Sequence, residues 1–105
     1  MEWIAIDAVE AFPPGSRRTL EIEGVPVAVY NVDGSYFAIA DTCTHAEATL
    51  SDGFLEGHEV VCPRHGARFS LVTGAALSPP AYEPVATFPV RVQDGIVRLG
   101  TTAAS

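Results

Sequence analysis

Lysine is absent from this chain of 105 residues, and its six cationic side chains are all arginines. Thirteen Asp and Glu residues outweigh them, so the formal net charge at pH 7 is −7. This acidity disfavours binding to nucleic acid or to anionic membranes, because both are negatively charged. It suits docking onto basic patches of other proteins, although composition alone favours plain solubility as the explanation.

The chain also lacks any apolar stretch approaching the ~20 residues that cross a membrane as a helix. A secretory signal begins with basic residues and continues with a long apolar segment. Residues 1–7 read MEWIAID, so this start is acidic and Asp7 interrupts its apolar run. We therefore expect a cytoplasmic protein, in which cysteines stay reduced and available to bind metal.

Cysteine is scarce, and both cysteines stand beside histidines. Residues 43–45 read CTH and residues 62–65 read CPRH, with sixteen residues between the two motifs. These motifs hold both cysteines and two of the three histidines in the chain. A disulfide between Cys43 and Cys62 is the simplest alternative, but it would leave His45 and His65 unexplained.

Two loops that each supply one Cys and one His fit the needs of a particular cofactor. A 2Fe-2S cluster requires four protein ligands, and in its Rieske form two histidines replace two cysteines on one iron. We therefore predict that Cys43 and Cys62 bind one iron of such a cluster, and that His45 and His65 bind the other.

The pattern C-x-H, sixteen residues, then C-x-x-H resembles the Rieske iron–sulfur family, and in particular the soluble ferredoxins of bacterial aromatic-ring dioxygenases. The resemblance runs from Trp3 to about Leu99. It implies an all-β Rieske fold of stacked antiparallel sheets, with a small cluster-binding subdomain inserted. It also implies a one-electron carrier between a flavin-dependent NAD(P)H reductase and a terminal ring-hydroxylating oxygenase.

The chain is not expected to be an enzyme itself. Rieske oxygenases add a mononuclear iron site held by two histidines and a carboxylate. With His45 and His65 committed to the cluster, only His58 remains. Two other interpretations stay open. Two Cys and two His suit tetrahedral zinc, although this order is unusual for zinc fingers. The small subunit of an assimilatory nitrite reductase also shares the Rieske fold.

The neighbours of the motifs predict the reduction potential. Rieske centres lie at roughly −150 to +300 mV. High-potential respiratory relatives carry a Ser and a Tyr that donate hydrogen bonds to sulfur, and an extra cysteine in each loop. The matching positions here are Ala67 and Phe69, and Ala48 and Arg64. We therefore expect a potential near the low end of the range. Gly66, without a Cβ, is expected to let backbone N–H groups approach the bridging sulfides.

The remaining pattern is one of short strands and turns in a single domain, residues 1–105. We expect strands at 17–23, 25–32, 35–40, 86–92 and 96–99, with Asp33-Gly34 and Asp94-Gly95 as hairpin turns. Segment 41–84 is rich in Gly and Pro and is predicted to be the cluster-binding subdomain. Within it we expect a hairpin of 54–56 and 58–61 around Gly57, and a strand at 67–71.

Several single residues carry smaller predictions. His58 is interpreted as an exposed residue near a turn. Arg64 and Arg68 are expected to form ion pairs within the cluster-binding segment, with Glu47 or another nearby acid. Residues 79–80, both proline, are interpreted as a stiff loop that shields the cluster, and Trp3 and Tyr82 as core or edge aromatics.

Overall fold

Short strands account for nearly all the regular structure of this protein. The computed structural model describes residues 2–43, 48–64, 66–79 and 83–103. The first half contains β1 (Trp3–Ala8), η1 (Val9–Ala11), β2 (Arg17–Ile22), β3 (Val25–Val32), β4 (Ser35–Ala40) and η2 (Leu50–Asp52). The second half contains β5 (Phe54–Glu56), β6 (Glu59–Val61), β7 (Arg68–Ser70), β8 (Thr87–Phe88), β9 (Val90–Gln93) and β10 (Ile96–Gly100).

Helical structure in the described ranges is limited to the two single 3-10 turns, η1 and η2, which confirms the all-β prediction. None of the helical segments described is long and apolar enough to cross a membrane.

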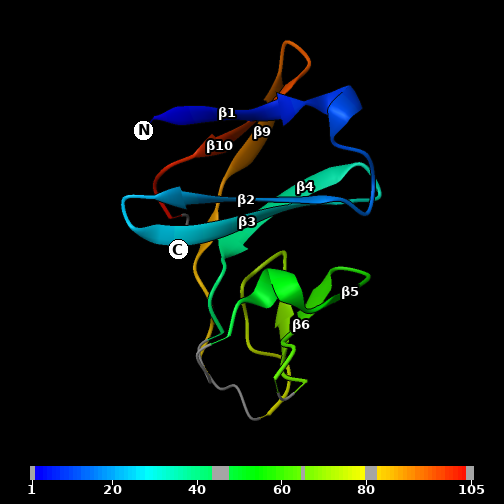
Figure 1. Ribbon diagram of the computed structural model, residues 1–105, viewed down its shortest axis with the longest axis vertical. Helices are drawn as coiled ribbons and strands as arrows, with labels where there is room; N and C mark the ends of the chain where they lie inside the picture. The colour runs from blue at the N-terminus through cyan, green and yellow to red at the C-terminus, as the bar shows by residue number, and fades with distance from the viewer. Residues whose placement is uncertain (1, 44–47, 65, 80–82, 104–105) are drawn as a thin grey trace.

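The strands stack in three levels. Within the described residues they form three antiparallel sheets, ordered β1-β10-β9, β2-β3-β4-β8 and β5-β6-β7. Figure 1 shows the strands β2, β3 and β4 between the level of β1, β9 and β10 above and the level of β5 and β6 below. The predicted stack of antiparallel sheets is therefore confirmed.

Strand β3 joins the levels because it is buried on both faces. Successive side chains of a strand point to opposite sides. Val27 and Val29 pack in one core cluster with residues of the first sheet, such as Val97. Ala28 and Tyr30 pack in a second core cluster on the other side. This second cluster also contains Val32, Ile39, Cys43, Leu50, Val60, Cys62, Ala67, Phe69, Leu71 and Val85. Both predicted ligand cysteines thus belong to the core on the third-sheet side of β3.

Local turn chemistry fixes the hairpins that the sequence predicts. The strands expected at 25–32 and 35–40 have these bounds in the structure, and Asp33 and Gly34 connect them with φ angles of 52° and 92°. Asp94 and Gly95 repeat the arrangement with φ angles of 55° and 74°. Two successive positive φ angles are the signature of the type I′ turn, whose twist matches that of the paired strands.

The strand predicted at 86–92 is wrong as a single element. Pro89 divides it into β8, which pairs with β4, and β9, which pairs with β10. Proline has no N–H to donate to a ladder, so the pairing stops there. The chain crosses from the second sheet to the first at this residue.

The sequence pattern also leaves β1 unpredicted. This strand pairs with β10, from Trp3 opposite Gly100 to Ala8 opposite Ile96, and forms an edge of the first sheet. The guanidinium of Arg91 lies 4.0 Å from the centre of the Trp3 ring. The interpretation of Trp3 as an edge aromatic is therefore confirmed.

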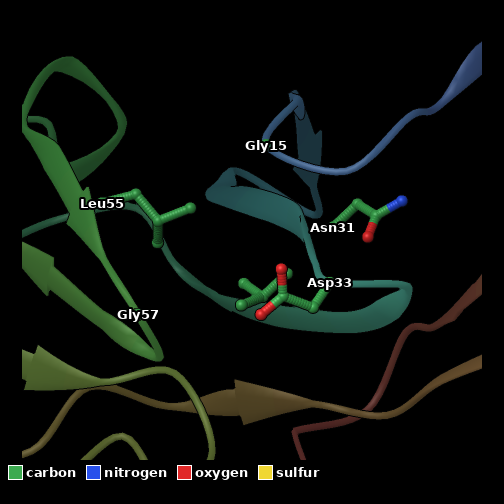
Figure 2. Close-up of a pocket in the computed structure, with 6 residues that line it drawn as sticks. Gly15, Asn31, Asp33, Leu55 and Gly57 are labelled. Atoms are coloured by element: carbon green, nitrogen blue, oxygen red, sulfur yellow. The ribbon is translucent and has the colours of Figure 1, made fainter.

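The third sheet meets the second along a seam, which Figure 2 shows as a pocket. The pocket is lined by Gly15, Asn31, Val32, Asp33, Leu55 and Gly57. Gly57 has a φ angle of 59° and turns the predicted hairpin of β5 and β6. The Asn31 amide donates to the Phe12 carbonyl at 2.8 Å and accepts from the Gly34 N–H at 2.8 Å. Its polar atoms are therefore used in holding the β3–β4 turn in place.

Candidate metal centre

The two cysteines of the motifs are buried in one apolar cluster. Cys43 follows β4 and is 3% exposed, and Cys62 follows β6 and is 1% exposed. Both belong to the core cluster on the third-sheet side of β3, together with Leu50 and Val60. Neither sulfur is in a disulfide, so that alternative is wrong. Soft thiolate ligands suit iron–sulfur clusters.

The two motif loops are closed by the same hydrogen bond. The Cys43 N–H donates to the Ala48 carbonyl at 2.9 Å, and the Cys62 N–H donates to the Ala67 carbonyl at 2.7 Å. In each loop the bond joins a cysteine to the fifth residue after it. The backbone therefore holds both cysteines at the start of loops with equal span.

The two histidines of the motifs, His45 and His65, lie outside the described residues, so their role as ligands stays a prediction. In the ranges that the structure covers, no three His, Cys, Asp or Glu side chains gather closely enough to hold a metal ion. His58 is exposed at the β5–β6 turn, with its ring centre 5.5 Å from that of Phe37. The interpretation of His58 as an exposed residue near a turn is confirmed.

Gly66 shapes the second loop through its own backbone, and the expected approach of N–H groups to the bridging sulfides stays a prediction. Its φ angle is 73°, and its N–H donates to the Cys62 carbonyl at 3.1 Å. A Cβ at this position would meet nothing within 4 Å. The glycine is therefore favoured by its left-handed backbone, and its own N–H is engaged within the loop. Ala67 and Phe69, which cannot donate to sulfur, are both fully buried beside the cysteines.

A buried clamp, which motif reasoning missed, holds the chain on both sides of the first loop. The Asp41 carboxyl is 4% exposed as a residue and accepts from the Ser51 N–H at 2.7 Å and from the Ser51 hydroxyl at 2.6 Å. From β2, the Arg17 guanidinium donates to the Ser51 carbonyl, and to the Gly53 carbonyl at 3.3 Å. We call Asp41, Ser51 and Arg17 the clamp. Its only sequence signal is an acid two residues before Cys43.

Tyr30 lies in the core cluster that contains both cysteines, and the clamp residue Arg17 places its guanidinium carbon 5.5 Å from the centre of the Tyr30 ring. Burial raises the pKa of its hydroxyl to about 12, and the nearby Asp41 carboxyl adds to the shift. Among the described residues, no group forms a hydrogen bond with the Tyr30 hydroxyl. Burial therefore extends the pH range over which the Tyr30 hydroxyl stays neutral.

Arg68 confirms the predicted ion pair within the cluster-binding segment. Its guanidinium lies 3.2 Å from a Glu56 carboxylate oxygen and 3.4 Å from a Glu59 oxygen. Arg64 is exposed. Glu47, Pro80 and Tyr82 lie outside the described residues, so the predictions that involve them stay predictions.

Comparison with known proteins decides the family. Residues 2–89 match the Rieske 2Fe-2S domain. The chain belongs to this family. Its cofactor is therefore one Rieske-type 2Fe-2S cluster rather than the zinc ion of the alternative interpretation. The donor set agrees with this cofactor, because the two thiols are buried, close to the third sheet and outside any disulfide.

Similar Rieske proteins are ferredoxins of dioxygenase systems. The ferredoxin component of the naphthalene 1,2-dioxygenase system of Pseudomonas aeruginosa is 40% identical over 92 residues, 88% of each chain. The 3-phenylpropionate/cinnamic acid dioxygenase ferredoxin subunit of Photorhabdus laumondii is 42% identical over 97 residues, 90% of each chain.

Solved structures extend the similarity to the fold. The ferredoxin of carbazole 1,9a-dioxygenase from Nocardioides aromaticivorans has a TM-score of 0.90, with 28% identity and coverage of 97% of this chain and 100% of that one. A chain in a complex of reduced oxygenase and oxidized ferredoxin in carbazole 1,9a-dioxygenase has a TM-score of 0.92. It is 36% identical, with coverage of 98% and 96%.

Proposed function

We propose that this protein is a soluble, cytoplasmic one-electron carrier of an aromatic-ring dioxygenase system. It would receive electrons from a flavin-dependent NAD(P)H reductase and pass them to a terminal ring-hydroxylating oxygenase. The observation that carries the proposal is the buried cysteine pair in two equally closed loops, on a chain about 40% identical to dioxygenase ferredoxins. When bound, a Rieske cluster takes up and releases a single electron.

We propose Cys43 and Cys62 as ligands of one iron, and His45 and His65 as ligands of the other. The segment 41–84 of the single domain 1–105 would then be the cluster-binding subdomain. Three features support this assignment: the two cysteines share one core cluster, the third sheet is built wholly from residues 54–70, and the clamp ties this segment to β2.

The protein would carry electrons without performing catalysis itself. Its net charge of −7 favours partners with basic docking patches. In high-potential Rieske relatives, hydroxyl groups at two matching positions donate hydrogen bonds to sulfur and favour the reduced cluster. Ala67 and Phe69 have no hydroxyl group, so both bonds are missing here. At about 1 kcal/mol each, every missing bond lowers a one-electron potential by roughly 40 mV. Two such bonds account for only roughly 80 mV of the Rieske range of about −150 to +300 mV, and the similarity to dioxygenase ferredoxins is the further reason to expect a midpoint near its low end. A titration midpoint near +300 mV would contradict this reasoning.

The test uses the anaerobically purified holoprotein. Iron and acid-labile sulfide should be present in equal amounts, and the reduced protein should give a Rieske EPR signal. His45→Ala and His65→Ala should each abolish the signal, whereas the matched control His58→Ala should retain it. A candidate NAD(P)H reductase should reduce the wild-type protein, which should then support oxygenase turnover. A His45→Ala protein with a normal signal would refute the ligand assignment.

A further inference from the structure

The third sheet carries a row of three apolar residues and one arginine on its outer face. In the ladder, Phe54 lies opposite Val61, and Val61 lies opposite Arg68. The segment after β7 extends the row, because the Leu77 N–H donates to the Arg68 carbonyl at 2.7 Å and Phe69 forms a bridge with Ala76. We call Phe54, Val61, Arg68 and Leu77 the outer row. With strands about 4.8 Å apart, it spans roughly 14 Å.

The direction of this row follows from strand alternation. The adjacent row consists of Leu55, Val60, Phe69 and Ala76, and it packs into the core cluster that contains both cysteines. Neighbouring residues on a strand point to opposite faces, so the outer row points away from that core. Phe54 is 71% exposed and Leu77 is 48% exposed. A large aromatic side chain this exposed marks a candidate contact site when other apolar residues lie beside it.

The outer row borders the second cysteine loop. Val61 directly precedes Cys62, and Arg68 directly follows Ala67, whose carbonyl closes the loop. At the Phe54 end of the row, the preceding residue Gly53 lies in close contact with the start of the same loop. A Cβ on Gly53 would lie 1.9 Å from the Val61 carbonyl oxygen and 3.1 Å from Pro63. Among the rows of residues across the third sheet, the outer row is therefore the one nearest to the proposed cluster.

The charged groups of this face are Arg68, within the outer row, and two acids in the row behind it. The Arg68 guanidinium reaches across β6 to the Glu56 carboxylate and also pairs with Glu59. These two acids share the next outward-pointing row of the sheet, since they lie opposite each other in the ladder. One guanidinium and two carboxylates leave one net negative charge, and Phe54 and Leu77 stay uncovered on the two sides.

We propose that the outer row is a docking surface for the terminal oxygenase, and that it fits an apolar hollow rimmed by a basic residue. This inference rests on the proposed electron-transfer function. The oxygenase is favoured over the reductase because a structurally similar chain, at a TM-score of 0.92, occurs in an oxygenase–ferredoxin complex. Phe54 would act as the anchor, since exposed aromatic side chains that enter partner pockets dominate interface energies. The net negative charge behind it would meet the basic rim.

The experiment compares holoprotein variants in a reconstituted system with separate readouts for each partner. Phe54→Ser and Leu77→Ser are the test variants, and Val92→Ser, 50% exposed on β9 of the first sheet, is the matched control. Oxygenase turnover is measured against ferredoxin concentration. Phe54→Ser should raise the KM for ferredoxin about 10-fold and leave kcat nearly unchanged, with a smaller rise for Leu77→Ser. Cluster content, EPR signal and midpoint potential should match the wild type.

Several results would overturn the proposal. One is that Phe54→Ser behaves like Val92→Ser toward the oxygenase. Another is a selective loss in the rate of reduction by the NAD(P)H reductase, which would make the reductase the occupant. A third is a wild-type dimer in sedimentation that Phe54→Ser dissociates, which would make a second copy the occupant. A failure of the proposed function differs from all three, because the wild-type protein would then lack the EPR signal or oxygenase turnover.

Discussion

Removing the Asp41 carboxyl should make the protein lose its cluster faster. This group accepts two hydrogen bonds from Ser51, at 2.7 and 2.6 Å, in a residue only 4% exposed. Together they tie the chain before the first cysteine loop to the chain after it. Each such bond contributes about 1–2 kcal/mol, so Asp41→Ala should cost about 2–4 kcal/mol. Ser51→Ala removes only the hydroxyl bond and should cost about half as much.

The assay follows visible absorbance of the holoprotein in urea under argon, where cluster loss is read as first-order bleaching. If the clamp opens before the cluster leaves, the cost of about 2–4 kcal/mol for Asp41→Ala corresponds to bleaching about 30- to 900-fold faster. Asp52→Ala, which changes an exposed acid in the same 3-10 turn, is the matched control and should bleach at nearly the wild-type rate. The variant carrying both Asp41→Ala and Ser51→Ala should bleach no faster than Asp41→Ala, because both changes remove the same contact.

Two outcomes would refute this reasoning. Wild-type bleaching in Asp41→Ala would show that the clamp stays closed while the cluster leaves. Equal acceleration in Asp52→Ala would show that negative charge near the loop, rather than the hydrogen bonds of Asp41, controls the rate.

Two further predictions concern the core and the close backbone contacts. Tyr30→Phe should raise stability by about 1 kcal/mol, since no described residue satisfies the buried hydroxyl. The Tyr30 pKa is raised to about 12 in the folded protein, so the wild type should lose stability as pH rises from about 10 through 12. Tyr30→Phe should lose less stability over this range. Urea midpoints measured across the same pH range test both points. Gly53→Ala should prevent assembly of the third sheet, because its Cβ would lie 1.9 Å from the Val61 carbonyl oxygen. Gly66→Ala, with open space but a φ angle of 73°, should cost only about 1 kcal/mol, so equal urea midpoints for the two alanine variants would contradict this contrast.

The sequence predicts elements whose signals are local. Strand β3 has its predicted bounds because a β-branched run ends at an Asp-Gly pair, and that pair needs no tertiary contact to turn the chain. Strand β1 is different, because its partner β10 lies at the far end of the chain and short apolar runs do not reveal such pairing. The division at Pro89 likewise follows from the two sheets that receive β8 and β9.

The candidate site likewise has features that local sequence predicts and features that depend on tertiary packing. The spacing of the two motifs predicts a cysteine pair at a metal centre, and the structure places both cysteines in one buried cluster. The clamp has no comparable pattern, since Arg17 and Ser51 lie 34 residues apart and meet only when β2 packs near the 3-10 turn η2. The outer row also depends on strand register, which sets Phe54 and Arg68 on one face although the residues between them include the whole second motif.

Because the same hydrogen bond closes each cysteine loop, the sixteen residues between the motifs do not determine the geometry of either loop. Each loop is complete within six residues, from Cys43 to Ala48 and from Cys62 to Ala67. The chain between them makes a hairpin whose tip, at Gly57, is exposed. Extra residues grafted into that tip would lengthen neither loop. The separation is thus a property of the intervening hairpin, and added length at its tip leaves the spacing within each cysteine loop unchanged.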